Sequence, residues 1–273
     1  MLLGVEIGGT KLQLGVCDRR GNLRQIVRET VNRPKGAAGI RQQIERLAPP
    51  LLRNVRAIGV GFGGPFDTNT GRAVRSHQIT GWDDFSVKRW FERKLRLPTF
   101  VDNDQNCAAF AEATVGAGRG LRRVFYVTVG TGIGGGLVID GELYNGRFGA
   151  AEIGHTWVGG HRLEAVASGL AIERGVSTVP ESARYVGIAI ANAIALINPD
   201  IVIVGGGVSL AGEKFFRPLR ATVRRMVFAP FRHNFKIVRA GLGETVVVVG
   251  AALLAVRGGR YALPRVRRRP VAR

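Results

Sequence analysis

Asp102, Asn103 and Asp104 follow a short apolar stretch and precede an alanine-rich segment. The pattern predicts a buried strand that passes directly into the N-terminus of a helix. An aspartate at such a junction often only caps the helix. A carboxylate at the mouth of a cleft can instead accept the proton of a substrate hydroxyl, as the catalytic aspartate does in phosphoryl transfer to alcohols. The residues alone leave both interpretations of Asp104 open.

Three glycine clusters could bring backbone amides close to a ligand. Residues 8–11 (GGTK) add a hydroxyl and an ammonium group to two glycines, which suits a phosphate, although GGT also makes ordinary hairpins. Residues 130–136 (GTGIGGG) hold more glycine than a hairpin needs, so the two turns could clamp a polyphosphate from both sides. Residues 205–207 follow an apolar strand, and they suit either close approach to an adenine ring or a simple strand-to-helix turn.

Polar side chains gather in a stretch that has little else to explain them. The carboxylates of Glu152 and Glu164 can accept hydrogen bonds from vicinal hydroxyls, and the imidazole of His155 can accept or donate them, which suits a sugar. A lone histidine is otherwise more often a satisfied structural residue. His155 and His161 make a poor zinc pair, because no cysteine accompanies them.

The elements that must position these residues follow from apolar patterns and turn signals. Apolar runs on both sides of the first glycine turn predict a strand hairpin. In the first part of the chain we expect strands at 2–7, 12–17, 23–30, 56–62 and 99–102, and helices at 37–52, after Asp84, and from 104 to about 115. Asp84 is expected to cap its helix, which carries Val87, Trp90, Phe91 and Leu95 inward.

The pattern restarts near residue 123. Strands at 123–129 and 135–140 flank the second glycine turn, and a helix at 183–197, a strand at 201–204 and a closing helix within 244–256 follow. Two halves that each open with a strand, a glycine turn and a strand suggest an internal duplication. We therefore expect an α/β protein with domains at 1–115 and 116–257, whose last helix packs back on the first domain. We predict that residues 258–273 form a basic tail, with five arginines between Pro264 and Arg273.

Composition limits the function classes. The chain has 273 residues, is 45% hydrophobic, and has neither an apolar run of roughly 18 residues nor a signal-peptide pattern, so we expect a globular cytoplasmic protein without membrane contact. The two cysteines form no disulfide framework. Forty Lys and Arg against 20 Asp and Glu give a net charge of +20, which could serve nucleic acid or simply reflect scattered surface arginines. Since no nucleic-acid-reading motif accompanies the charge, we expect no specific nucleic-acid partner, and only weak, sequence-independent attraction by the tail.

Eight motifs occur in order between residues 2 and 256: VEIGGTKLQLGV, GVGFGGPFD, GW at 81–82, VDNDQN, VGTGIGGG, EIGH, LEAVASG and IVIVGGG. The set resembles the ROK family (repressors, ORFs and kinases), whose enzymes include bacterial glucokinases, fructokinases and N-acylhexosamine kinases. The resemblance implies a two-domain actin/hexokinase-like ATPase fold with a ribonuclease H-like core in each half. It also implies phosphorylation of a hexose hydroxyl, expected to be the 6-OH, with Mg²⁺ and ATP in a cleft beside the sugar.

The resemblance assigns roles by position. Asp104 corresponds to the catalytic base. The sugar ligands correspond to Gly64, Asn103, Asp104, Glu152, His155 and Glu164. The ATP ligands correspond to Gly8, Gly9, Thr10, Lys11, Gly130, Thr131, Gly132, Gly205 and Gly206.

Two departures from the family pattern change the expectations. The zinc motif with its three cysteines is missing, since eight residues without cysteine separate His155 from Glu164, so we expect no structural zinc and a remodelled wall behind His155. Glu6 replaces the commoner aspartate of the first phosphate loop, and we expect it to hold a Mg²⁺-bound water. We further expect a homodimer. There are two alternatives. A sugar-sensing regulator is disfavoured because the first strand, at residue 2, leaves no room for a helix-turn-helix module. A non-catalytic sugar-binding protein is disfavoured because Asp104 and both phosphate loops are present.

Overall fold

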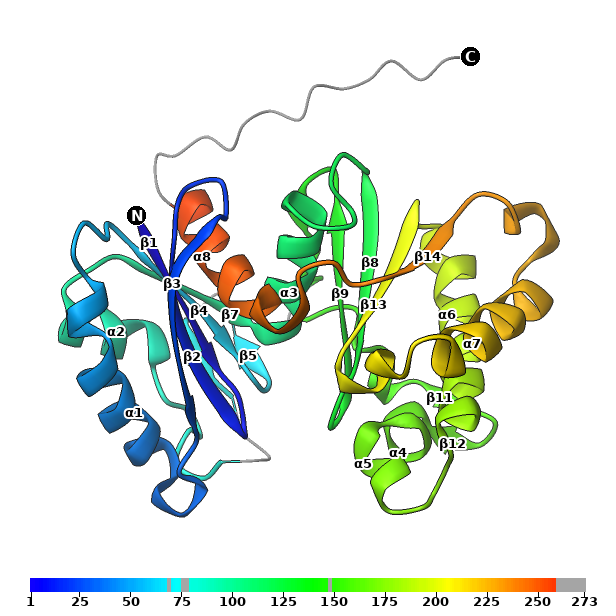
Figure 1. Ribbon diagram of the computed structural model, residues 1–273, viewed down its shortest axis with the longest axis horizontal. Coiled ribbons are helices and arrows are strands. Elements are labelled where there is room, and N and C mark those ends of the chain that lie inside the picture. Colours follow the sequence, from blue (N-terminus) through cyan, green and yellow to red (C-terminus); the bar gives the residue numbers. More distant parts are fainter. Residues whose placement is uncertain (68–69, 75–78, 147–148, 259–273) are drawn as a thin grey trace.

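Two five-stranded sheets lie side by side in the computed structural model, which describes residues 1–67, 70–74, 79–146 and 149–258. Helices α3 and α8 lie between the sheets, and the other long helices cover their outer faces (Figure 1). The predicted basic tail lies outside the described residues except for its first residue, which ends α8. No described helix is long and apolar enough to cross a membrane.

The first sheet has the strand order β3-β2-β1-β4-β7. Its strands are β1 (Leu2–Ile7), β2 (Lys11–Cys17), β3 (Leu23–Thr30), β4 (Ile58–Phe62) and β7 (Thr99–Asn103). The first three strands are antiparallel, whereas β1, β4 and β7 run parallel. β1 and β4 are buried along their whole length, as expected for parallel strands that are covered on both faces.

The second sheet repeats this order as β10-β9-β8-β13-β14. Its strands are β8 (Arg123–Val129), β9 (Ile133–Ile139), β10 (Glu142–Leu143), β13 (Ile201–Gly205) and β14 (Lys236–Arg239). Again the first three strands are antiparallel and β8, β13 and β14 run parallel. The restart of the pattern, predicted from the two glycine turns, is therefore confirmed at the level of topology.

Helices α1 (Gly36–Leu47) and α2 (Val87–Leu95) belong to the first half, and α6 (Val179–Ile197) and α7 (Glu213–Met226) to the second. Between the sheets lie α3 (Asp104–Thr114) and α8 (Val246–Gly258). Short elements complete the fold: β5 (Phe66–Asp67), β6 (Arg72–Ala73), β11 (Trp157–Val158), β12 (His161–Arg162), α4 (Leu163–Ala167) and α5 (Gly169–Glu173). Single 3-10 turns lie at Arg33–Lys35, Pro49–Leu51, Ile153–His155, Gly207–Ala211, Ala229–Phe231 and Gly243–Thr245.

The last helix packs against the first sheet at very short range. A Cβ added at Gly59 of β4 would lie 1.6 Å from Ala251 O of α8, and one at Gly4 of β1 would lie 2.0 Å from Val248 O. Only glycine allows backbones to approach this closely. A buried apolar cluster joins α8 to α3 and to residues of both sheets, so a helix that follows the second sheet in sequence completes the core against the first sheet.

Glu112, at the end of α3, ties together the two segments by which the chain crosses between the sheets. Its Oε2 accepts a hydrogen bond from Ala117 N (2.8 Å) in the crossing from α3 to β8. Its Oε1 accepts one from Leu242 N (2.9 Å) in the return from β14 to α8. The side chain is fully buried, so this one carboxylate links both crossings away from water.

Several expectations about the elements are wrong in detail. The helix expected at 183–197 begins earlier, at Val179, and the strand expected at 56–62 begins at Ile58. The helix predicted for 37–52 ends at Leu47, because consecutive prolines at 49 and 50 cannot continue it, and a 3-10 turn follows. Asp84 does not cap α2. The N-cap is Ser86, and Asp84 takes a positive φ of 51° and pairs with Arg72 (Oδ1 to Nε, 2.5 Å). The strand expected at 135–140 begins at Ile133, directly after the glycine turn.

Candidate active site

Asn103, rather than Asp104, caps α3. Asn103 Oδ1 accepts a hydrogen bond from Gln105 N (2.8 Å), which is the N-cap contact, and its Nδ2 donates to Gly64 O (3.1 Å). Asp104 is the first residue of the helix, and only its Oδ1 shares the Gln105 amide (2.9 Å). Its Oδ2 faces Gly63, where an added Cβ would lie 3.3 Å away. The capping interpretation therefore applies to Asn103, and one oxygen of Asp104 points toward the neighbouring glycine loops.

The parallel strands bring these loops to one edge of the first sheet. Ile7 pairs in register with Phe62, and Phe62 with Asn103. The residues that follow, Gly8, Gly63 and Asp104, therefore emerge side by side at the carboxyl ends of β1, β4 and β7. In open α/β sheets this is the edge where ligands bind.

The carboxyl of Asp104 is protonated more readily than an ordinary aspartate. Its removal from water raises the pKa to about 7, and the nearby carboxylates of Glu6 and, to a smaller extent, Glu152 act in the same direction. The hydrogen bond from Gln105 opposes this rise. A carboxylate with a pKa near neutrality can accept a proton from an alcohol more effectively than one with an ordinary pKa.

The first glycine turn is closed by a hydrogen bond from Gly8 N to Lys11 O (3.0 Å). Lys11 Nζ lies 3.5 Å from Glu6 Oε1. Burial raises the pKa of Glu6, and Lys11 and Gln13 oppose this rise. The turn therefore combines backbone amides, a hydroxyl and an ammonium group with a carboxylate beside them.

Gln13, which none of the motif assignments singled out, orients Glu6. Its Nε2 donates to Glu6 Oε2 (2.6 Å) and to Glu244 O (3.1 Å), and its Oε1 accepts from Arg28 Nε (2.6 Å). Gln13 is fully buried in β2. The signal was an amide within an otherwise apolar strand (KLQLGVC), since a buried amide needs partners.

The second and third glycine clusters meet at the corresponding edge of the second sheet. Gly205 pairs in register with Thr128, and Gly206, with φ of 85°, lies so close to Val129 that a Cβ would be 2.4 Å from its carbonyl oxygen. The turn at 130–132 follows Val129 directly. An ATP molecule that contacts both clusters would therefore rest on one edge of this sheet.

Glu164 lies against the second glycine turn. Its Oε2 accepts a hydrogen bond from Ile133 N (2.8 Å), and a Cβ on Gly132 would lie 2.5 Å from that oxygen. The pKa of Glu152 is raised, first because its carboxyl is partly withdrawn from water and then by Glu164, while His155 lowers it. The three polar residues that the sequence singled out after residue 150 are therefore close enough to act on one another. Glu152 also acts on Asp104 of the first half.

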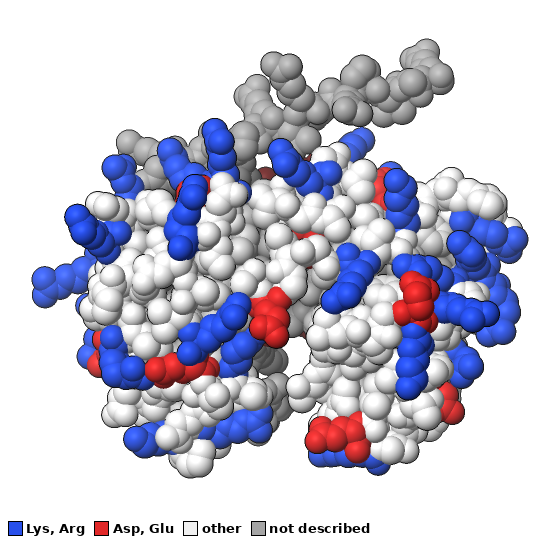
Figure 2. Space-filling model, in the orientation of Figure 1, with Lys and Arg blue, Asp and Glu red and all other residues white. Residues whose placement is uncertain are grey.

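The predicted residues thus form two groups, one from each half. Figure 2 shows an indentation between the halves at the lower edge of the molecule, and in Figure 1 the tip of the β1–β2 hairpin and α4 lie on its opposite sides. A hydrogen bond also joins the two halves: Asn106 Nδ2 of the first half donates to Asn145 Oδ1 of the second (3.0 Å). The same Nδ2 donates to Asp102 Oδ1 (2.8 Å) within the first half. Asn145 follows β10, so its contact with Asn106 ties the segment after that strand to α3, the helix that begins with Asp104.

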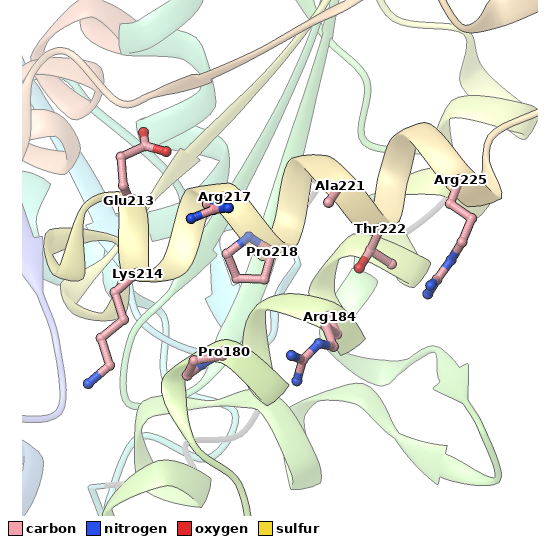
Figure 3. Close-up of a pocket in the computed structure, with 9 residues that line it drawn as sticks. All are labelled: Pro180, Arg184, Glu213, Lys214, Arg217, Pro218, Ala221, Thr222 and Arg225. Atoms are coloured by element: carbon pink, nitrogen blue, oxygen red, sulfur yellow. The ribbon is translucent and has the colours of Figure 1, made fainter.

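A separate groove of about 620 Å³ runs between α6 and α7, on the outer face of the second half (Figure 3). It is lined by Pro180, Arg184, Glu213, Lys214, Arg217, Pro218, Ala221, Thr222 and Arg225. None of these residues belongs to the predicted site. Figure 2 shows Lys and Arg on both halves of the face that it presents, so basic side chains are not confined to this groove.

The residues of the first edge suit Mg²⁺ better than zinc. Glu6 offers a carboxylate beside the first glycine turn, and Mg²⁺ prefers oxygen ligands and keeps several waters. Within the described part of the chain, no three His, Cys, Asp or Glu side chains group as a metal site. Absence of zinc stays a prediction, which elemental analysis of the purified protein would check.

Comparisons with known proteins agree with this arrangement. The sequence profile of the ROK family matches residues 2–182 and 166–257. A glucokinase from Halalkalibacterium halodurans is 30% identical, over 92% of this chain and 94% of that protein. The crystal structure of a ROK family glucokinase from Streptomyces griseus, in complex with glucose and AMPPNP, superposes with a TM-score of 0.83 at 31% identity, over 94% of this chain and 99% of the other.

A regulator is similar as well. The xylose repressor of Caldicellulosiruptor bescii is 25% identical over 77% of this chain and 64% of its own length. The structural match confirms the two-domain actin/hexokinase-like fold that the motifs predicted. The boundaries at 115 and 257 and the roles of individual residues stay predictions.

Proposed function

This chain belongs to the ROK family, and we propose that it transfers the γ-phosphoryl group of ATP to a hexose hydroxyl, with Asp104 as the general base. The glucokinases among its relatives support phosphorylation of a sugar. The observation that supports Asp104 most directly is its position. One carboxylate oxygen faces the glycine loops at the carboxyl edge of the first sheet, and its pKa is raised to about 7.

In the proposed reaction Asp104 accepts the proton of the attacking hydroxyl, expected to be the 6-OH. Asn103 caps α3 and thereby fixes the start of the helix that carries Asp104. The backbone amides of the two glycine turns, with Thr10, Lys11 and Thr131, hold the phosphates. Adenosine packs against the backbone of Gly205 and Gly206. Most of the rate enhancement then comes from positioning and from stabilised charge, as is general for phosphoryl transfer.

Mg²⁺ would neutralise charge on the β- and γ-phosphates when bound, and Glu6 would hold one of its waters. Gln13 keeps the Glu6 carboxylate facing the turn by a hydrogen bond of 2.6 Å. Gly64, Asn103, Glu152, His155 and Glu164 would bind the sugar, which is a glucose-like hexose, fructose or an N-acylhexosamine. Closure of the two halves on the sugar would exclude water and so limit hydrolysis of ATP.

We expect kcat/KM to fall at acidic pH, by about tenfold for each pH unit below about 7. The base acts only when it is deprotonated, and the raised pKa of Asp104 means that protonation begins near neutrality. The measurement is kcat/KM between about pH 5.5 and 8.5, by direct quantification of ADP so that no coupling enzyme limits the rate. A profile that stays flat down to pH 5.5 would contradict the assignment of Asp104.

Glu152→Gln and Glu164→Gln should each lower kcat/KM for the best sugar by about tenfold or more, because charge-assisted hydrogen bonds are worth roughly 1.5–3 kcal/mol. The affinity for an ATP analogue should change much less. Since Glu164 also accepts from Ile133 N, an amide that keeps one acceptor oxygen can retain this contact. Glu173→Gln, at an exposed position of α5, is the matched control and should leave both quantities unchanged. Unchanged sugar kinetics in both site variants would remove the two residues from the sugar site.

A sugar-sensing regulator is the second candidate, because the xylose repressor matches much of the same chain. One experiment separates the two. Release of ADP is measured over a panel of hexoses, amino sugars and N-acetyl sugars with Mg²⁺·ATP. Sugar-dependent ADP release supports the kinase, whereas sugar binding by calorimetry without any ADP release supports the regulator.

A further inference from the structure

Arg33 contacts the tip of the first glycine turn, although it is more than twenty positions away in the sequence. The chain after β3 runs along the tip of the turn, where Val31 N donates to Thr10 O (2.9 Å). From this segment Arg33 Nε donates to Gly9 O (2.7 Å), and its Nη2 donates to Thr10 Oγ1 (2.7 Å). The guanidinium is therefore held in place by the turn itself.

Among the residues that the structure describes, no carboxylate neutralises the charge of Arg33. In the described part of the chain the guanidinium forms no ion pair, and its remaining N–H groups have no hydrogen-bond partner. By comparison, Lys11 lies 3.5 Å from Glu6. Arg33 is exposed, so its free N–H groups remain available to a ligand. An arginine fork presents several such donors in one plane, which matches the oxygens of a phosphate.

The contact with Arg33 also orients the hydroxyl of Thr10. A hydroxyl oxygen that accepts a hydrogen bond directs its own hydrogen elsewhere. Thr10 Oγ1 accepts from Arg33, and Thr10 is the most exposed residue of the turn. Its O–H can therefore donate to a phosphate oxygen beside the turn rather than to the protein.

The first turn lies on the side where the transferred phosphate must be. Asp104 and Gly8 emerge at the same edge of the first sheet, so a hydroxyl activated by Asp104 attacks a phosphate held at this edge. The two glycine clusters of the second sheet lie at the corresponding edge of that sheet, where the proposed function places the rest of the nucleotide. The cation beside the first turn therefore faces the terminal phosphate rather than the α-phosphate.

We propose that Arg33 binds the terminal phosphate of the donor and holds Thr10 ready to do the same. The inference rests on the proposed function, because it assumes a nucleotide in this cleft. It concerns ground-state binding as well as catalysis, since the guanidinium is in place without a ligand. It predicts that Arg33 distinguishes ATP from ADP.

The test measures the affinity of the full chain for AMPPNP and for ADP, each with Mg²⁺, by calorimetry. Arg33→Ala should weaken AMPPNP binding by about tenfold or more, the usual worth of a charge-assisted contact, and ADP binding by no more than about twofold. Arg33→Gln should resemble Arg33→Ala, because a neutral amide can still donate to Gly9 O but carries no charge. Arg53→Ala, at another exposed arginine without a hydrogen bond in the described residues, is the control and should change neither affinity.

Equal losses for both ligands, or a wild-type affinity in Arg33→Gln, would show that Arg33 only supports the turn, and would overturn the proposal. The proposed kinase function is tested separately, by phosphorylation of the sugar panel. If the wild-type chain binds AMPPNP in the Arg33-dependent way but phosphorylates no sugar of the panel, the kinase fails and Arg33 stands. If the wild-type chain binds neither nucleotide, both proposals are wrong.

Discussion

Asp104→Asn should lower kcat by about 10²–10⁴-fold, the usual contribution of a positioned general base. The substitution keeps the size of the side chain and the oxygen that accepts from Gln105 N, but an amide cannot take a proton from an alcohol. The affinity for sugar should change by much less than kcat, because the amide still bonds to a hydroxyl. A folded variant with more than a tenth of the wild-type kcat would contradict the role of Asp104.

The same variant should be no less stable than the wild-type chain at pH 8. The pKa of Asp104 is about 7 in the folded chain, against an ordinary value of 3.8. As the pH rises, this group therefore loses its proton at a lower pH in the unfolded chain than in the folded chain. The free energy of unfolding consequently falls as the pH rises from about 4 to about 7. The amide in the Asp104→Asn variant stays neutral at every pH and removes this cost. Thermal unfolding at pH 8 checks it, and a much lower Tm for the variant would mean that lost activity reflects lost structure.

Glu112→Ala should cost about 2–4 kcal/mol of unfolding free energy, because two backbone N–H groups lose their acceptor and a cavity forms where the buried side chain was. The two groups are Ala117 N and Leu242 N, one in each crossing between the sheets. Glu112→Gln keeps one acceptor oxygen, so its free energy of unfolding should fall by less than that of Glu112→Ala. Urea unfolding of both variants gives the two free energies.

An exposed-surface variant, Glu45→Ala, serves as the control for Glu112. Glu45 pairs with Lys94 at 3.0 Å, and both side chains are well exposed. Exposed ion pairs are worth little, so this change should lower the unfolding free energy by less than about 1 kcal/mol. If Glu112→Ala were no more destabilising than Glu45→Ala, the buried carboxylate would not hold the crossings together.

Much of the fold could be predicted because its signals are local. Apolar runs on both sides of a glycine turn specify β1 with β2 and β8 with β9. The valine run at 246–249, ambiguous by periodicity, is assigned to a helix by the alanines and leucines that follow, and it begins α8. The cap of α2 could not be predicted in the same way. Asp84 is a better N-cap residue than most, but its carboxylate pairs with Arg72, which reaches it only in the folded chain.

The candidate site was predictable as residue types but not as contacts. Asp104 and the glycine turns lie in motifs, whereas Gln13 and Arg33 act through partners that are distant in sequence or on another strand. Spacing also could not show that Asn103 takes the capping role and frees an oxygen of Asp104. Nor could it show that Glu164 bonds to the backbone after the second glycine turn.

The position of α8 has a consequence for synthesis on the ribosome. The strands β1 and β4 leave the ribosome early, but the helix that covers them begins only at Val246. At about 5–20 residues per second, roughly 10–50 s pass between translation of β1 and of α8. During this interval the nascent chain holds an apolar sheet face without its native cover, so the first half cannot complete its core until α8 has been translated. Chaperones that bind exposed apolar segments therefore have a long period in which to act on this chain.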